Sequence, residues 1–405
     1  MSSSSPSDVF RLGAEFTRRE IAPHLQDWED EGLIPRELHA AAAKQGVLGL
    51  GFPEEVGGSG GDVLDTLDLQ EGMTSEGASS GLLAGLFTHG IALPHVVAAF
   101  ERGEGHDGGR HLVDRFVRPT LAGEMIGSLA VTEPGGGSDV AGIRTTAVRD
   151  GDHYVVNGAK TYITSGVRAD FVTTAVRTGT QSNGGAGHAG ISLLVVEKGT
   201  PGFTVDRSLR KMGWHCSDTA ELSYVDVRVP VENLVGVENS GFYQIAEQFV
   251  VERIGLAVHA YGIAARALAL AAAYAQDRDT FGKPLVANQV VRHKLVEMHR
   301  QVEVARTYTR EVARRHTLHI QGQGEQVIAE ACLAKDTACS AATAVTYEAV
   351  QLFGGAGYMH GTEVERHYRD ARILPIGGGA TEVLADLAAK LLGYTPTRPA
   401  TGATA

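Results

Sequence analysis

Hydrophobic residues change their spacing twice along the chain. Up to about residue 125 they recur at helical spacing among Ala, Leu, Glu and Arg, as in "DVFRLGAEFTRREIAPHLQDWEDEG". From Ile126 the pattern changes to short β-branched runs separated by Gly and Asp, such as "DFVTTAVRTG" and "GISLLVVEKG". After Ser240 helical spacing returns in long stretches, the first of which is ended by Gly282 and Pro284. The order of predicted elements is therefore helical, β and again helical.

These changes predict where the domains begin and end. We expect an N-terminal helical domain over residues 1–125, a middle β domain over residues 126–239, and a C-terminal helical bundle over residues 240–394. The final segment, "TPTRPATGATA" at residues 395–405, is predicted to be a disordered tail. A chain of 405 residues is long enough to bury a large core in such a division.

Composition narrows the possible partners. With 36 Lys and Arg against 48 Asp and Glu, the net charge is −12, which disfavours nonspecific binding to nucleic acid or anionic lipid. The N-terminal "MSSSSPSDVFRLG" lacks a basic segment followed by an apolar one, and no stretch approaches 18 uninterrupted apolar residues. We therefore expect a cytoplasmic protein without a membrane span. Neither CxxC nor HExxH occurs, so no metal site is predicted.

The loop "LAVTEPGGGSDVAG" is the richest polar segment. A predicted strand ends near Thr132 and runs into glycines and Ser138, which offers hydroxyls and free backbone N–H groups to a flat or phosphorylated ligand. Further along, "KTYITSG" places Tyr162 and Thr164 on a strand that could lie alongside. Composition alone does not distinguish between two interpretations, a structural loop and a ligand-binding loop.

A second candidate is "RDTFGKP", at the end of the first long C-terminal helix. Arg278 offers a planar fork of donors for phosphate oxygens, and Phe281 offers a stacking surface. Taken alone, an ordinary surface Arg and a core Phe are the commoner explanation.

Glu252 interrupts an apolar row on that helix. It lies between Phe249 and Leu256 at helical spacing, although the helix is apolar nearly all round. Two interpretations remain open on spacing alone. The carboxylate either pairs with a basic group between domains, or stays unpaired with a raised pKa that suits a proton acceptor.

Three consecutive glycines, Gly377 to Gly379, stand in "RDARILPIGGGATEV". Glycine lets a ligand approach the backbone closely, but a plain turn is the more frequent role of such a triplet.

Six segments in order, taken together, resemble the acyl-CoA dehydrogenase family. They are "AVTEPGGGSDVAG", "NGAKTYITSG", "KMGWHCSDTAELSYVDVRVPVENLVG", "RDTFGKPLVANQ", "QLFGGAGY" and "RDARILPIGGGATEV". The resemblance extends to about Tyr394. It implies an α+β multidomain fold with an N-terminal helical domain, a middle β-barrel or sandwich domain and a C-terminal four-helix bundle, in agreement with the pattern above.

By this resemblance the protein carries FAD and forms a homotetramer, a dimer of dimers. The isoalloxazine and ribityl part is expected at Leu129, Val131, Thr132, Gly137, Ser138, Tyr162 and Thr164. The pyrophosphate and adenine end is expected across a subunit interface at Arg278, Phe281, Gln289, Gln351 and Gly355, with Glu382 as a further cofactor contact. Substrate contacts are expected at Ser138, Arg253 and Gly378.

The chain departs from the commonest family pattern at Gly378, where many members carry the catalytic Glu. In the isovaleryl-CoA and long-chain subgroups that position is Gly or Ala, and the base comes from the long helix, directly before an Arg. Here that residue is Glu252, before Arg253. Other departures are Tyr162, where Trp is frequent, His215, where Arg is frequent, and Ala380, where Thr is usual.

The resemblance implies α,β-dehydrogenation of an acyl-CoA to the trans-2-enoyl-CoA in fatty-acid or branched-chain catabolism. Glu252 would remove the pro-R α-proton while the β-hydrogen leaves as hydride to flavin N5. The backbone N–H of Gly378 and a ribityl hydroxyl would polarise the thioester oxygen. Electrons would pass to electron-transferring flavoprotein.

Other functions remain open within this fold. One is a carrier-protein-linked dehydrogenase or an acyl-CoA oxidase of a biosynthetic pathway. Another is a non-catalytic FAD-binding scaffold or a DNA-associated member of the family. The net charge of −12 disfavours DNA binding, and the presence of Glu252 disfavours a catalytically inactive scaffold.

Overall fold

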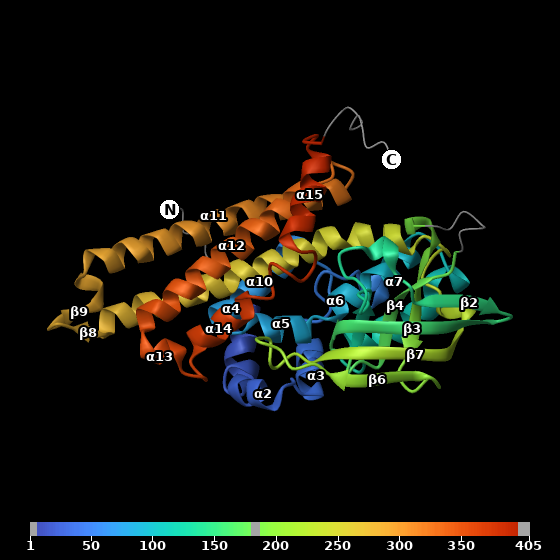
Figure 1. The fold of residues 1–405 in the computed structure, drawn as a ribbon, viewed down its shortest axis with the longest axis horizontal. Helices are drawn as coiled ribbons and strands as arrows, with labels where there is room; N and C mark the ends of the chain where they lie inside the picture. Colours follow the sequence, from blue (N-terminus) through green and yellow to red (C-terminus); the bar gives the residue numbers. More distant parts are fainter. Residues whose placement is uncertain (1–5, 180–186, 396–405) are drawn as a thin grey trace, which may run out of the picture.

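The structure, a computed structural model, describes residues 6–179 and 187–395. In Figure 1 the strands lie toward one end of the long helix α10 (Gly241–Asp277), and the other long helices run beside α10 toward the opposite end. The α+β multidomain fold predicted from the sequence is confirmed. Of the tail predicted to be disordered, residues 396–405 lie outside the described residues.

Short helices build the N-terminal part. Helix α4 begins with a capping box, in which the Asp62 side chain accepts the N–H groups of Leu64 and Asp65 and the Asp65 carboxylate accepts the N–H of Asp62. The helices are α1 (Asp8–Phe16), α2 (Leu25–Glu31), α3 (Arg36–Lys44), α4 (Val63–Ser75), α5 (Ser80–Leu86), α6 (His89–Ala92), α7 (Pro94–Glu101), α8 (Arg110–Leu112) and α9 (Arg118–Leu121).

The middle part is a seven-stranded sheet with the order β1-β4-β2-β3-β7-β6, in which β5 also pairs with β4. Its pairs are antiparallel, except that β4 runs parallel to β1 and β2. The strands are β1 (Gly127–Ala130), β2 (Thr146–Asp150), β3 (His153–Thr164), β4 (Phe171–Arg177), β5 (Ile191–Glu197), β6 (Phe203–Ser208) and β7 (Thr219–Pro230).

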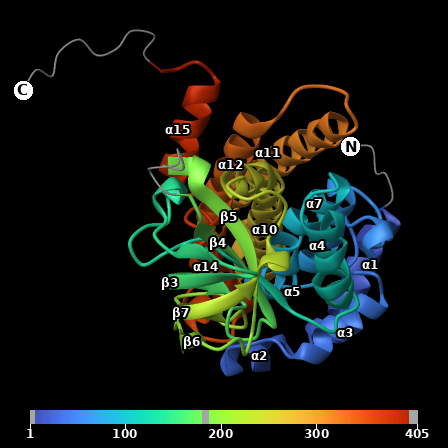
Figure 2. The same cartoon turned by 90° about the vertical axis from the view of Figure 1, so that its right-hand side faces the viewer.

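Strands β4 and β5 are buried on both faces, which explains their continuous apolar runs. One face packs on the N-terminal helices, where the rings of Phe116 and Phe171 lie 4.9 Å apart, and the other face lies in the core of the sheet. Figure 2 shows the strands on one side of α10 and the N-terminal helices on the other.

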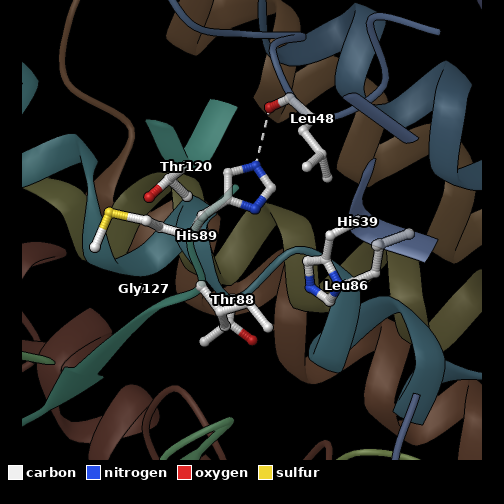
Figure 3. A pocket seen from close by; sticks show the side chains of 9 residues that line it. His39, Leu48, Leu86, Thr88, His89, Thr120 and Gly127 are labelled. Carbon is white, nitrogen blue, oxygen red and sulfur yellow. Dashed lines mark hydrogen bonds between the residues drawn. The ribbon is translucent and has the colours of Figure 1, made fainter. Parts of the chain in front are cut away.

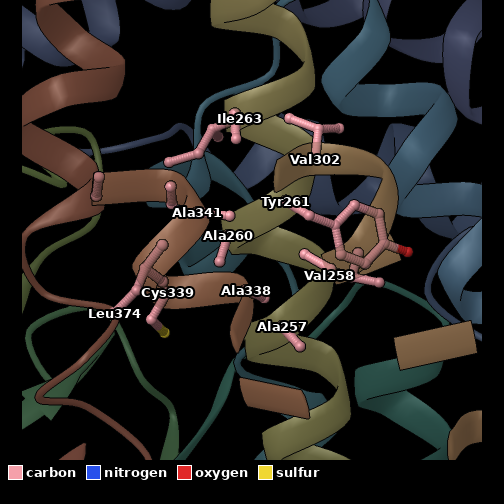
Figure 4. Close-up of a cluster of buried hydrophobic side chains, with 14 of the residues drawn as sticks. Ala257, Val258, Ala260, Tyr261, Ile263, Val302, Ala338, Cys339, Ala341 and Leu374 are labelled. Carbon is pink, nitrogen blue, oxygen red and sulfur yellow. The ribbon is translucent and has the colours of Figure 1, made fainter. Parts of the chain in front are cut away.

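The C-terminal part is a helical bundle whose core is rich in alanine. Helix α10 packs most extensively against α12, and small side chains such as Ala257, Ala260, Ala338 and Ala341 line the contact (Figure 4). Small residues let helix axes approach closely. The remaining elements are β8 (Asp279–Thr280), β9 (Lys283–Pro284), α11 (Gln289–Ile320), α12 (Ile328–Phe353), α13 (Gly355–Tyr358), α14 (Glu363–Ala371) and α15 (Thr381–Leu391).

Helix α10 is long and apolar enough to cross a membrane by length and composition alone. In the structure, however, 61% of its most apolar window is buried inside the protein, against α12, α11 and α4. Its hydrophobicity is therefore accounted for by its place in the core.

A small pocket is lined by His39, Leu48, Thr88 and His89 and is too tight to admit a water molecule (Figure 3). The Nε2 of His89 lies 2.9 Å from the carbonyl oxygen of Leu48. Burial lowers the pKa of His39 to about 3 and that of His89 to about 4, so both rings are neutral. The pocket is part of the packed core and offers no room to a substrate.

A buried ion pair joins the β domain to the N-terminal helices. The Nε of Arg168 lies 2.5 Å from Oδ1 of Asp218, and its guanidinium also donates to the carbonyl oxygens of Ile34 (2.9 Å) and Gly85 (3.4 Å). Asp218 additionally accepts the N–H of Val167 at 2.9 Å. This network fixes the loop that follows β3 against α3 and α5.

We expect Arg168→Met to destabilise the protein by about 3–5 kcal/mol, because it leaves the buried Asp218 carboxylate without its cation. Arg207→Met is the matched control, since Arg207 forms a solvent-exposed pair with Glu221, and its loss should change the stability much less. Chemical denaturation of both variants measures the difference. Equal losses in the two variants would contradict the role given to Arg168.

Candidate active site

The glycine triplet lies in a tight loop between α14 and α15. The N–H of Thr381 donates to the carbonyl oxygen of Pro375 at 3.1 Å and closes the loop. Gly378 and Gly379 have φ values of +64° and +104°, in the region that favours glycine. Within the described part of the chain, the N–H of Gly378 has no hydrogen-bond partner. The loop thus presents a free backbone donor.

Glu252 reaches this loop from α10. A Cβ atom placed on Gly378 would lie 3.3 Å from Oε1 of Glu252 and 2.2 Å from Cδ1 of Leu256. Leu256 would have to move for any side chain to enter at this position. The carboxylate and the glycine loop, far apart in the sequence, therefore meet.

The surroundings of Glu252 make it a weaker acid than an ordinary Glu. The side chain is half-buried, and burial raises its pKa above the usual 4.5, while the charges of Arg253 and Lys335 act in the opposite direction. A raised pKa suits a group that must take up a proton near neutral pH.

Arg253 follows Glu252 but has different contacts. Its guanidinium carbon lies 5.5 Å from the centre of the Phe249 ring, and the side chain is buried. Its Nε is buried without a hydrogen-bond partner among the residues that the structure describes. The predicted role of Arg253 in substrate binding stays a prediction.

Lys335 is a candidate that the hydrophobic pattern does not reveal. It lies on α12 with an exposed fraction of 0%, and its Nζ donates to the carbonyl oxygen of Gly379 at 2.8 Å. The only sequence signal is a charged residue inside the small, apolar run "EACLAKDTACSAA".

A second buried pair anchors the loop that follows β1. The Nζ of Lys160 lies 2.9 Å from Oε1 of Glu133 and 3.0 Å from the carbonyl oxygen of Val131. Glu133 also accepts the N–H groups of Arg144 (2.7 Å) and Thr145 (2.9 Å). Burial lowers the pKa of Lys160 to about 8, although Glu133 acts against this shift. Glu133 is therefore an anchor of the loop.

This anchor brings together the residues predicted to hold the isoalloxazine and ribityl part. The N–H of Thr161 donates to the carbonyl oxygen of Thr132 at 2.9 Å, so the loop runs beside β3. Residues 134–139 are exposed. Tyr162 is also exposed, with an exposed fraction of 69%, and its backbone has a φ of +61°. The loop carries Val131, Thr132, Gly137 and Ser138. The strand before it, β1, carries Leu129, and the adjacent end of β3 carries Tyr162 and Thr164.

The residues predicted for the other cofactor end lie at the far end of the bundle. Phe281 is fully exposed, and the exposed guanidinium of Arg278 has no hydrogen bond or ion pair with any described residue. Gln289, Gln351 and Gly355 are exposed as well. Figure 1 places β8, β9 and α13 at the end of α10 opposite the sheet, so one chain does not bring the two groups together. Glu382 is exposed in the first turn of α15.

The chain matches the descriptions of three domains of a single family. These are the acyl-CoA dehydrogenase N-terminal domain over residues 10–100, the middle domain over residues 128–227 and the C-terminal domain over residues 239–393. The chain belongs to the acyl-CoA dehydrogenase family.

The long-chain specific acyl-CoA dehydrogenase of Mus musculus mitochondria is 36% identical to this acyl-CoA dehydrogenase family member, over 96% of this chain and 86% of the mouse protein. The crystal structure of a probable acyl-CoA dehydrogenase from Mycobacterium abscessus is 59% identical, with a TM-score of 0.90, and the match covers 95% of this chain and 98% of that one. An FAD complex of PigA is 25% identical with a TM-score of 0.87, covering 96% and 98% of the two chains.

As a member of this family the protein is an FAD-dependent oxidoreductase. Its exposed surfaces fit that cofactor. The Tyr162 ring and the bare loop at residues 135–137 suit a flat ring system, since a Cβ on Gly135 or Gly136 would meet no atom within 4 Å. The exposed guanidinium of Arg278 and the exposed ring of Phe281 suit a pyrophosphate and an adenine.

Lys160→Met should weaken FAD binding about 10-fold or more, because it leaves Glu133 buried without its cation and frees the loop. Lys198→Met, at an exposed lysine of the same domain, is the matched control and should bind FAD like the parent. Titration of the apoprotein with FAD, followed by flavin fluorescence, gives both dissociation constants. Unchanged affinity in Lys160→Met would show that the loop does not need this anchor.

Proposed function

We propose that this protein dehydrogenates an acyl-CoA thioester to the trans-2-enoyl-CoA, with Glu252 as the base that removes the α-proton. The observation that supports this most is the 3.3 Å separation between Oε1 of Glu252 and the Cβ position of Gly378. A base on α10 thus reaches the space that a side chain at residue 378 would enter. The general activity of the family, which is the oxidation of acyl-CoA, agrees with this chemistry.

The glycine loop supplies a second element of the reaction. The free N–H of Gly378 can donate to the thioester oxygen, which increases the acidity of the α-carbon as negative charge develops on that oxygen. Because residue 378 has no side chain, Glu252 approaches the loop backbone closely, and Leu256 has to move for the thioester to lie between this donor and Glu252. When bound, FAD supplies the acceptor for the β-hydride.

The proposed cofactor site draws on more than one subunit. Along α10 the distance from Glu252 to Arg278 is about 39 Å at 1.5 Å per residue, far longer than one dinucleotide. We therefore propose a homotetramer, a dimer of dimers, in which Arg278, Phe281, Gln289, Gln351 and Gly355 serve a neighbour's FAD. We also propose electron-transferring flavoprotein as the electron acceptor, on the family resemblance.

Glu252→Gln should lower the rate of flavin reduction by acyl-CoA about 10²- to 10⁴-fold, because Gln keeps the size of Glu but cannot take up a proton. Anaerobic rapid mixing, with bleaching of the FAD absorbance as the signal, measures this rate. Glu247→Gln, at an exposed carboxylate on the same helix, should react like the parent. Both variants should retain FAD. A Glu252→Gln protein reduced as fast as the parent would mean that the base is another residue.

The rate should also depend on pH in a defined direction. Because burial raises the pKa of Glu252 above 4.5, the base stays protonated at pH values where an exposed Glu is already ionised. Flavin reduction should therefore accelerate as the pH rises through this raised pKa and level off above it. Rates measured from about pH 5 to pH 9 test this, and a profile without a rise over that range contradicts the assignment.

A further inference from the structure

Lys335 is a buried cation without a close carboxylate. Its exposed fraction is 0%, and it forms no ion pair within 4.0 Å among the described residues. Its one hydrogen bond in that part of the chain is the 2.8 Å contact from Nζ to the carbonyl oxygen of Gly379. Lysine is rarely fully buried without a partner, because removing an ammonium group from water is costly. A lysine buried in this way therefore calls for a specific role.

Lys335 contacts the loop that presents the Gly378 N–H donor. Gly378 and Gly379 have no side chains to fix them, and the loop closes on itself through the bond between Thr381 and Pro375. Lys335 ties the Gly379 carbonyl to α12. The held carbonyl lies one residue along the chain from the Gly378 N–H, so this tie limits the movement of the backbone that carries the donor.

The charge of Lys335 also acts on Glu252. The ionised groups that influence Glu252 are Arg253 on its own helix and Lys335 on α12, and both favour the carboxylate form. Burial lowers the pKa of Lys335 and Arg253 acts in the same direction, whereas Cys339, Asp336 and Glu252 favour the charged amine. Without Lys335, Arg253 would be the remaining cation acting against the burial of Glu252.

We propose that Lys335 is the positioning residue of this site: it holds the carbonyl of Gly379 and so brings its ammonium group to the same glycine loop that the Glu252 carboxylate reaches. The proposal rests on the role of Glu252 as the base. Lys335 acts through the backbone of Gly379 and through its charge, so its role is to position other groups. It makes the base effective by keeping Glu252 ionised and makes the donor effective by keeping Gly378 in place.

The test compares pH profiles of flavin reduction, using a saturated straight-chain acyl-CoA and anaerobic rapid mixing. Lys335→Met removes both the charge and the donor while keeping a long side chain. We expect the midpoint of the profile to move to higher pH, and the rate near pH 7 to fall about 10-fold more than the plateau rate at high pH. Lys335→Gln, which keeps a donor without the charge, should show the same displacement with a smaller loss of plateau rate.

Val345→Ala is the structural control. Val345 is buried on the same helix, so its truncation should lower the melting temperature. It should leave the midpoint of the pH profile where the parent has it. If Lys335→Met does not fold, Lys335→Gln decides the matter.

Two outcomes separate this inference from the proposed function. If Glu252→Gln abolishes reduction but both Lys335 variants keep the parent's midpoint, Lys335 has only a structural role and the inference is overturned. If Glu252→Gln reacts like the parent, the proposed base itself is wrong. A displaced midpoint in the Lys335 variants, absent from Val345→Ala, supports the positioning role.

Discussion

The close packing of α10 against α12 is the constraint on which the site depends. Alanine-rich surfaces let the two helices pack closely, and the alanines along this α10–α12 seam are buried. Glu252 extends from one helix and Lys335 from the other, and both meet the loop at Gly378 and Gly379. Larger side chains along the seam would separate the carboxylate from the loop, because a packed core transmits such displacements instead of absorbing them.

Among the residues that the structure describes, three buried cations hold backbone carbonyls. Lys160 binds the carbonyl oxygen of Val131, Arg168 binds that of Ile34, and Lys335 binds that of Gly379. Each of the three bonds fixes a connecting segment to a neighbouring element. The first two cations have a carboxylate partner that offsets their desolvation, whereas Lys335 has none within 4.0 Å among the described residues. This difference is what sets Lys335 apart from a structural ion pair.

Exposed aromatic rings mark the surfaces that a single chain leaves uncovered. Tyr162 lies on the β domain and Phe281 at the far end of the bundle, and both have positive φ values. A non-glycine residue in that conformation is uncommon and is often found at functional sites. The exposure and the backbone conformation of both residues agree with surfaces completed by a ligand or a second subunit.

The sequence by itself determined the order of helical and β parts, the long apolar helix carrying Glu252, and the glycine triplet, because periodicity and glycine content are local properties of the chain. Periodicity shows that a helix face is buried but does not identify the neighbour that covers it. Three contacts become visible only in the folded chain: Leu256 lies over Gly378, Lys335 reaches Gly379 from another helix, and Glu133 anchors its loop. These contacts join segments distant in the chain, and their geometry is set by helix packing that no local pattern records.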